Sequence, residues 1–324
     1  MKAVLCTRYC GPDDLEIRDL PDPVAGPGEA VVRVRAAALN FFDTLIIAGK
    51  YQVKPTFPFS PAAEFAGEVE SVGPGVTTVS AGERVAGNVS YGAAREKLAV
   101  AADRLTPLPD TLDFDRAAGL IVTYGTALYA LRNRAQLRPG ETLAVLGAAG
   151  GVGLAAVEIG KLLGAHVVAC ASSAEKLALA QRLGAEAGVN YAKEDLKDAL
   201  RRLNGGQGPD VIYDPVGGAA TEPALRALAW GGRFLVIGFA AGEIPKLPLN
   251  LPLLKNCDIR GVYWGAWTER DRAGHRANLA EIFQWCAQGN LSAHVHATFS
   301  LEQTAQALHA LADRQAMGKV ILRP

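Results

Sequence analysis

The sequence predicts an α/β protein with a β-rich amino-terminal domain and a second domain built on a doubly wound parallel sheet. The chain has 324 residues, which is enough for two domains with separate cores. Short β-branched segments separated by Gly and Pro clusters fill its first third, whereas strands and helices alternate from residue 142 onward.

The first domain is predicted from residues 1 to about 109. Residues 30–35 (AVVRVR) and 64–69 (EFAGEV) have the composition of strands, and clusters such as DPVAGPGE and KPTFPFSP interrupt the chain between strands. This spacing is typical of a small barrel or sandwich. A helical segment follows from Asp113 and ends at Arg138–Pro139–Gly140.

The second domain is predicted from βαβ units. Thr142–Gly147 is a buried strand followed by a helix to Leu163, and His166–Ala171 is a strand followed by the helix Ala174–Leu183, which ends at Gly184. Further elements are the strands GVNY, DVIYD and RFLVIG, helices near 219–232, 278–288 and 301–314, and strands near 294–299 and 319–324. We expect the last of these to return to the first domain, so that residues 1–115 and 267–324 form one domain and 116–266 the other.

Composition excludes several classes of function. The 33 Lys and Arg residues balance 33 Asp and Glu residues, so the chain lacks the positive charge that nucleic-acid binding requires. No apolar run approaches the roughly 18 residues of a membrane helix, and the first residues, MKAVLCTR, lack the apolar region of a signal peptide, so we expect none. Five cysteines without a C-x-x-C pattern argue against a disulfide framework. We therefore expect a cytoplasmic protein.

A metal site is not expected either. The first half of the chain has no cysteine after Cys10 and no histidine, so it lacks the usual zinc ligands apart from carboxylates. The pair His294 and His296 is interpreted as two surface histidines on one solvated strand face.

A glycine-rich turn carries the strongest functional signal. Gly147–Gly153 (GAAGGVG) follows a predicted strand and opens a predicted helix, the context in which such a turn binds a dinucleotide. Gly150 would let the backbone approach a diphosphate, Gly153 would let the helix pack on the sheet, and the amides of Gly151 and Val152 lie at the positive helix end. The alternative is a turn of small residues without a ligand.

The second strand ends without an acidic residue. Ser172, Ser173 and Lys176 lie where a carboxylate would hold the ribose of NAD, and they offer hydroxyl groups and a cation to a 2′-phosphate. These residues favour NADP(H), although Lys176 could equally be a solvated helix residue.

Longer stretches resemble a known family over the whole chain. AAALNFFDTLIIAGKY, FPFSPAAEFAGEVESVGPGV, LGAAGGVGLAAVEIGKLLGA and DPVGG resemble the zinc-independent NADPH:quinone oxidoreductase (zeta-crystallin-like) family of the medium-chain dehydrogenase/reductase superfamily. The resemblance implies a GroES-like catalytic domain, a Rossmann domain, NADP(H) in the cleft between them, and a homodimer. Ala63 stands where the alcohol dehydrogenase branch has a zinc-ligand histidine, which makes zinc-assisted alcohol oxidation unexpected.

The resemblance also assigns residues. It places cofactor contacts at Thr126, Tyr191, Gly217, Gly238, Phe239 and Lys319, and polar residues of the substrate cleft at Asn40 and Tyr51. Asn40 could instead hold its own loop, and Tyr51 could be a structural tyrosine. Glu64 is expected to pair with an arginine, and Asp43 to bond the backbone of its own turn.

The implied reaction is hydride transfer from NADPH to a small electrophile, in the first place a quinone. Asn40 and Tyr51 are the candidates for stabilising the product anion, with solvent providing the proton. One alternative is an enoyl or enal reductase that acts on α,β-unsaturated carbonyl or acyl-CoA substrates. Another is a non-catalytic NADPH-binding structural protein.

Overall fold

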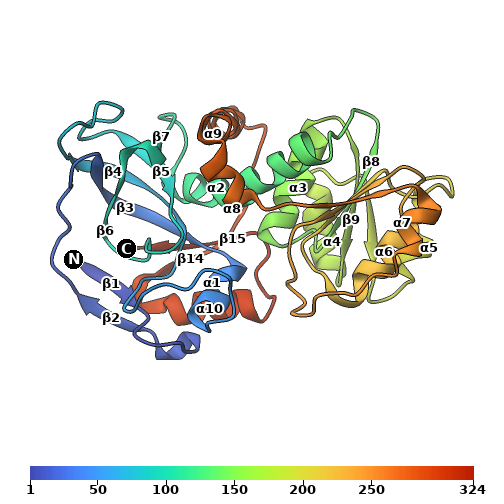
Figure 1. Ribbon diagram of the computed structural model, residues 1–324, viewed down its shortest axis with the longest axis horizontal. Coiled ribbons are helices and arrows are strands. Elements are labelled where there is room, and N and C mark those ends of the chain that lie inside the picture. The colour runs from blue at the N-terminus through green and yellow to red at the C-terminus, as the bar shows by residue number, and fades with distance from the viewer. The chain divides into compact units, whose positions relative to one another are not determined.

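The computed structural model describes all 324 residues, which form two compact units (Figure 1). Unit 1 comprises Met1–Val122, Leu279–Gly289 and Ala293–Pro324, and unit 2 comprises Thr123–Asn278 and Asn290–Ser292. The chain crosses between them inside the helices α2 (Phe114–Leu128) and α9 (Arg272–Ala287). The sequence placed both divisions earlier, at residues 115 and 266, because a continuous helix contains no linker signal. None of the helices combines the length and the hydropathy needed to span a bilayer.

Unit 1 is built on a seven-stranded sheet. Its strand order is β14 (Val295–Ser300), β15 (Lys319–Arg323), β3 (Glu29–Leu39), β4 (Glu64–Val72), β5 (Arg84–Asn88) and β7 (Leu105–Pro107), with β6 (Lys97–Ala101) also paired to β3. A separate pair consists of β1 (Lys2–Leu5) and β2 (Glu16–Asp19), and the helices are α1 (Phe41–Ile47) and α10 (Thr304–Ala312). The β-rich first domain is therefore confirmed.

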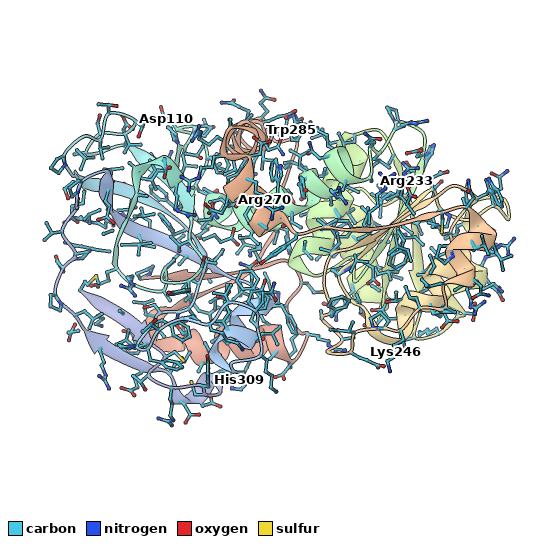
Figure 2. The ribbon with its side chains drawn as sticks, viewed as in Figure 1. Asp110, Arg233, Lys246, Arg270, Trp285 and His309 are labelled. Atoms are coloured by element: carbon cyan, nitrogen blue, oxygen red, sulfur yellow. The ribbon has the colours of Figure 1, made fainter.

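The carboxyl-terminal tail completes unit 1, as the sequence predicted. The last strand, β15, runs antiparallel to β3 and pairs Ile321 with Ala38. The ring of His309 in α10, labelled in Figure 2, lies 3.0 Å from the carboxylate of Asp13. Side chains such as Val32, Phe65 and Leu322 from three neighbouring strands share one buried core.

Unit 2 is a parallel six-stranded sheet in the order β10-β9-β8-β11-β12-β13. The strands are β8 (Thr142–Leu146), β9 (His166–Ala171), β10 (Ala187–Asn190), β11 (Val211–Asp214), β12 (Arg233–Val236) and β13 (Asp258–Gly261). Numbered along the chain, this is the order 3-2-1-4-5-6 of a Rossmann fold. The predicted doubly wound domain is confirmed. The edge strand β13 was not among the predicted strands, because its residues are mostly exposed and polar.

Helices cover both faces of this sheet. On one face, α3 (Gly151–Leu162) packs closely, because a Cβ atom at Gly160 would lie 2.5 Å from Leu143. On the other face, α5 (Leu196–Leu203) and α6 (Thr221–Ala227) share a core with alternate strand residues such as Ala144 and Val168. The remaining elements are α4 (Ala174–Arg182), α7 (Asn250–Lys255), α8 (Trp264–Arg270), a π-helical turn over Tyr129–Arg134, and the 3₁₀ turns Pro12–Asp14, Ala102–Arg104, Gly218–Ala220 and Leu301–Gln303.

An ion pair supports the base of the sheet in unit 2. Arg233, labelled in Figure 2, donates to both carboxylate oxygens of Glu141, at 3.0 and 2.6 Å. Its Nε atom also donates to the backbone oxygen of Ala135. Both side chains are largely buried, so this bidentate pair orders the loop before β8.

Candidate functional site

The glycine-rich turn has the geometry that the sequence predicted. The strand β8 ends at Leu146, Gly147 turns the chain with φ of +58°, and Gly150 is the N-cap residue of α3. A Cβ atom at Gly153 would lie 2.2 Å from the backbone oxygen of Gly147, so only glycine fits between helix and turn.

There is room for close approach at Gly150. A Cβ atom there would meet only the Gly147 oxygen, at 3.5 Å. The amides of Gly151, Val152 and Gly153 lie in the first turn of α3, where no intrahelical acceptor exists. The turn therefore has N–H groups without helical acceptors at the positive end of a helix, an arrangement that suits a diphosphate.

Other predicted cofactor residues follow the carboxyl ends of neighbouring strands in unit 2. Ser172 and Ser173 follow β9, Tyr191 follows β10, Gly217 follows β11, and Gly238 and Phe239 follow β12. Because all these strands are parallel, the residues lie along one edge of the sheet. The strand β8 lies between β9 and β11, where the direction of winding reverses, which is the place where such sheets bind ligands.

A buried carboxylate shapes the turn after β11. Asp214 is 3% exposed, and it accepts hydrogen bonds from the amides of Val216 and Gly217 and from the hydroxyl of Thr221, at 2.8, 2.9 and 2.7 Å. Gly217 has φ of +69°, and a Cβ atom there would lie 2.9 Å from the ring of Phe239. The motif DPVGG does not by itself predict a role for Asp214, because its three hydrogen-bond donors come together only in the folded turn.

The end of β9 carries hydroxyl groups. Ser173 caps α4, where its Oγ atom accepts a hydrogen bond from the Lys176 amide at 3.3 Å. Ser172 is exposed, and Lys176 is half-buried on the first turn of the helix. The chain from Ala171 to Ser173 has no carboxylate.

Thr126 lies in α2 within unit 2 and is buried, with 9% of its surface exposed. Nearby in sequence, the Tyr124 hydroxyl donates to Glu158, a buried carboxylate of α3 that also accepts the amide of Ser292 at 2.7 Å. This interaction joins the start of unit 2 to α3 and was not predicted, because the three residues are far apart in the sequence.

In unit 1, Asn40 lies between β3 and α1 and is part of a buried network. Its Nδ2 atom donates to Glu64 at 2.9 Å, and its Oδ1 atom accepts from Lys319 at 2.7 Å. The amide is therefore held at both ends, and its second Nδ2 hydrogen is not used by these two bonds. Asn40 is 7% exposed, so the network fixes the orientation of an almost buried amide.

Lys319, for which the family resemblance implies a cofactor contact, is part of the same buried network. It lies in unit 1, is 3% exposed, and directs Nζ to Leu39 O, Asn40 Oδ1 and Glu64 Oε1 at 3.1, 2.7 and 2.8 Å. An ammonium group has three hydrogens, so these bonds use all of them. In this network Lys319 positions Asn40, and its contact with the cofactor stays a prediction.

The prediction that Glu64 pairs with an arginine was wrong. Glu64 is fully buried and pairs with Lys319 rather than with an arginine. Its other oxygen accepts the Val122 amide at 2.7 Å. The pairing depends on β15 lying beside β3, and no local sequence pattern shows that neighbour.

Asp43 is structural, as predicted. It is fully buried, and it accepts the Asn40 amide at 2.7 Å within its own turn and the Ala62 amide at 3.0 Å across the fold. Burial raises the pKa of its carboxyl group to about 7. Asp43 thus fixes the backbone on both sides of the Asn40 network.

Tyr51 lies in the loop after α1 and is half-buried. Its ring stacks on Phe42, with centroids 5.4 Å apart and an interplanar angle of 21°. This contact holds the ring against α1.

Comparisons with known proteins agree with this architecture. Residues 26–110 match the alcohol dehydrogenase GroES-like domain, and residues 151–279 match the zinc-binding dehydrogenase family. The quinone oxidoreductase-like protein 2 of Rattus norvegicus is 40% identical over 322 residues, which cover 99% of this chain and 91% of that protein. The chain belongs to the quinone oxidoreductase family of the medium-chain dehydrogenases/reductases.

Two further members of this superfamily bear on its chemistry. The crystal structure of Escherichia coli quinone oxidoreductase complexed with NADPH has a TM-score of 0.92 and 28% identity, and all of both chains is covered. The 2-haloacrylate reductase of a Burkholderia species is 30% identical over 97% of this chain and 96% of that protein.

This quinone oxidoreductase family member contains no group of three or more His, Cys, Asp or Glu side chains arranged to hold a metal ion. His294 and His296 are half-buried rather than solvated, because the ring of His294 packs closely against Gly318 at the start of β15.

A recess of about 380 Å³ opens beside the turn after β11. Residues from Gly218 to Arg226 and from Glu243 to Lys246 line it, and Figure 2 labels Lys246. None of the predicted cofactor residues lines this recess, so it is not the dinucleotide site that the sequence predicts.

Proposed function

We propose that this family member is an NADPH-dependent reductase that transfers a hydride from NADPH to a quinone. The observation that carries the proposal is the amide-lined turn at Gly150–Gly153, located where the winding of the parallel sheet reverses. The E. coli relative, which was crystallised with NADPH, supports the choice of cofactor.

The residues of unit 2 fit this cofactor. The amides of Gly151, Val152 and Gly153 would hold the diphosphate, which Gly150 lets approach the backbone, and Ser172, Ser173, Lys176 and Tyr191 would hold the 2′-phosphate. Thr126, Gly217, Gly238 and Phe239 would complete the site. When bound, NADPH supplies the hydride, while the chain orients the ring and shields it from water.

In unit 1, Asn40 and Tyr51 are the groups that stabilise the product anion. The Glu64–Lys319 pair holds the Asn40 amide so that its remaining Nδ2 hydrogen can donate to the oxyanion of a hydroquinone or an enolate. The Tyr51 hydroxyl donates a second hydrogen bond to this oxyanion, and solvent provides the proton that the product takes up. A preorganised donor of this type contributes about 3 kcal/mol to lowering the barrier.

We propose that the reaction is independent of zinc. Ala63 replaces the histidine ligand of the alcohol dehydrogenase branch, and Asn40, near the position of the cysteine ligand, is engaged by Glu64 and Lys319. The donor set for zinc is therefore incomplete. Metal analysis of the purified protein should find no stoichiometric zinc, and a chelator should leave turnover unchanged.

A second candidate is the reduction of an activated alkene, which the similarity to 2-haloacrylate reductase favours. Steady-state assays with 9,10-phenanthrenequinone, an alkenal and crotonyl-CoA at one NADPH concentration distinguish the two. The highest kcat/KM with the quinone supports the first proposal, and the highest value with an alkene supports the second. Tight NADPH binding without turnover of any acceptor would instead indicate a non-catalytic, structural NADPH-binding protein.

We also propose a homodimer formed along β13. This strand is a sheet edge whose outer N–H and C=O groups have no strand partner. Large apolar side chains are exposed in the segments just before and after it in the chain, with Leu249 81%, Leu253 78% and Tyr263 59% exposed. Pairing with a second copy would extend the sheet and cover these groups. Light scattering should give the mass of a dimer, and Leu253→Lys should yield monomers with an unchanged circular dichroism spectrum.

A further inference from the structure

Two cysteine side chains in unit 1 lie in contact. The sulfur atoms of Cys6 and Cys10 are 3.7 Å apart, and the Cys6 thiol donates to the backbone oxygen of Arg8 at 2.9 Å. Cys6 is fully buried, Cys10 is half-buried, and both are free thiols. A disulfide has an S–S distance of about 2.0 Å, so its formation shortens the present separation and breaks the bond of the Cys6 thiol to Arg8, which changes the conformation of residues 6–10.

The backbone of these cysteines holds both ends of the segment that carries Tyr51. Cys10 N donates to Ile47 O at 2.9 Å, which ties down the start of this segment. Cys6 exchanges two backbone hydrogen bonds with Phe59, at 2.7 and 3.1 Å, which tie down its end. Residues 47–59 therefore form a loop whose two anchors are the two cysteines.

Tyr9, between the cysteines, packs against the same loop. Its ring leaves so little space at Gly49 that a Cβ atom there would lie 2.9 Å from it. Its centroid is 4.9 Å from that of Phe57 in an edge-on arrangement, and the Lys54 ammonium lies 5.8 Å from it. A change in the conformation of residues 6–10 is thus transmitted to the loop at several points.

We propose that Cys6 and Cys10 are a modification site: a peroxide converts them to a reversible disulfide that rearranges the loop of residues 47–59 and lowers the efficiency of reduction of the electron acceptor. The kinetic consequence rests on the proposed function, whereas the disulfide and the loop rearrangement do not.

The chemistry uses two thiols and one hydrogen peroxide. The Cys10 sulfur attacks one peroxide oxygen, the O–O bond breaks, and Cys10 becomes a sulfenic acid as water leaves. The Cys6 sulfur then attacks the Cys10 sulfur, the S–O bond breaks, and a second water leaves with the thiol proton of Cys6. The two thiols lose two electrons, and the peroxide gains them.

The surroundings of the two sulfurs set this order. Cys10 is the more accessible, so it meets the oxidant first. Burial raises the pKa of the Cys6 thiol to about 12, so this thiol stays protonated and resists oxidation until a sulfenic acid forms beside it. An external thiol reverses the reaction.

Tryptic peptides test the disulfide directly. Arg8 lies between the two cysteines, so complete digestion places Cys6 in the peptide Ala3–Arg8 and Cys10 in the peptide Tyr9–Arg18. After treatment of the full-length protein with hydrogen peroxide and alkylation of free thiols, we expect these peptides to be linked, and dithiothreitol to separate them. Cys257→Ser should give the same link and Cys10→Ser none. Separate peptides, with Cys10 intact or oxidised to a sulfinic acid, would overturn the proposal.

Limited proteolysis tests the loop without any turnover. Lys50 is exposed within it and is followed by Tyr51, so trypsin should cleave the native oxidised protein after Lys50 at a rate at least threefold different from that of the reduced protein. Lys54 precedes Pro55 and is not a tryptic site. The Cys10→Ser variant should show no change with peroxide. A linked protein whose cleavage rate equals that of the reduced protein would refute the loop rearrangement.

Kinetics test the consequence for the reaction. Because a displacement of about 1 Å at a substrate-contacting group lowers rates by up to about 10²-fold, we expect kcat/KM for the acceptor to fall about tenfold on oxidation and to recover with dithiothreitol. The affinity for NADPH should not change, because the residues proposed to hold its phosphates lie in unit 2 and outside the loop of residues 47–59. An unchanged kcat/KM in the linked protein would refute the regulatory effect. If the reduced protein turns over no acceptor, the proposed function fails, while the peptide and cleavage results still decide for or against the modification site.

Discussion

Replacement of Lys319 by methionine tests whether the buried ion pair positions Asn40. Lys319 and Glu64 are 2.8 Å apart, with 4% and 0% of their side chains exposed. At an effective dielectric constant of about 20, their gross attraction is about 6 kcal/mol, and removal of one partner from a buried pair costs about 3–5 kcal/mol because the other charge stays buried. We expect Lys319→Met to lower the free energy of unfolding by that amount.

The measurement is a double-mutant cycle in urea, followed by far-UV circular dichroism. Glu64→Gln with Lys319→Met removes both charges, so the double variant should be at least about 1 kcal/mol more stable than the sum of the single losses predicts. If the single losses add, the pair does not hold unit 1 together and our reasoning is wrong.

Activity supplies a readout that a purely structural role would not change. Lys319→Arg keeps the charge and should retain more kcat than Lys319→Met, measured at a temperature where both variants are folded. The NADPH dissociation constant should be the same in both, because the Lys319 ammonium group directs its hydrogens to Leu39, Asn40 and Glu64. A weakened NADPH affinity in Lys319→Met would instead support the predicted contact of this residue with the cofactor.

Three further predictions follow from single positions. Gly153→Ala places a Cβ atom 2.2 Å from a backbone oxygen, so fluorescence titration should show that NADPH binding is at least about 100-fold weaker. The control Gly265→Ala, whose Cβ atom would meet its nearest neighbour at 3.8 Å, should bind NADPH normally. Lys176→Ala should weaken NADPH binding by about 10- to 100-fold and leave NADH binding unchanged, whereas the matched control Lys161→Ala should change neither. Equal affinities for NADPH and NADH in the wild type would refute the NADP assignment. The pKa of Asp43 is raised from 3.8 to about 7 in the folded state. Its contribution to stability is therefore complete below about pH 4 and is lost as the pH rises to about 7, a change of up to about 4 kcal/mol in the free energy of unfolding. Urea unfolding at a series of pH values should show this change in the wild type and not in Asp43→Asn. Parallel pH curves for the wild type and Asp43→Asn would show that Asp43 does not titrate in this range.

Several features of unit 2 could be predicted from sequence because each depends on residues close together in the chain. The strand Thr142–Leu146, the turn and the helix Gly151–Leu162 are contiguous, and the glycine at 153 is required by a contact with Gly147 only six positions away. The parallel sheet likewise follows from the alternation of strands and helices. The Asp43 hydrogen bond to Asn40 is also local.

The sequence alone therefore determined the two-domain α/β fold, the position of the glycine-rich turn between strand and helix, and the family to which the chain belongs. Only the tertiary structure decided that Lys319 binds Asn40 and Glu64, that Asp214 shapes the turn before Gly217, and that Cys6 and Cys10 anchor the loop around Tyr51. Sheet pairing brings residues 279 and 255 positions apart into one buried network. Ion pairs of this kind leave no periodic signal in the chain, because their energy depends on burial and distance, which exist only once the strands have paired.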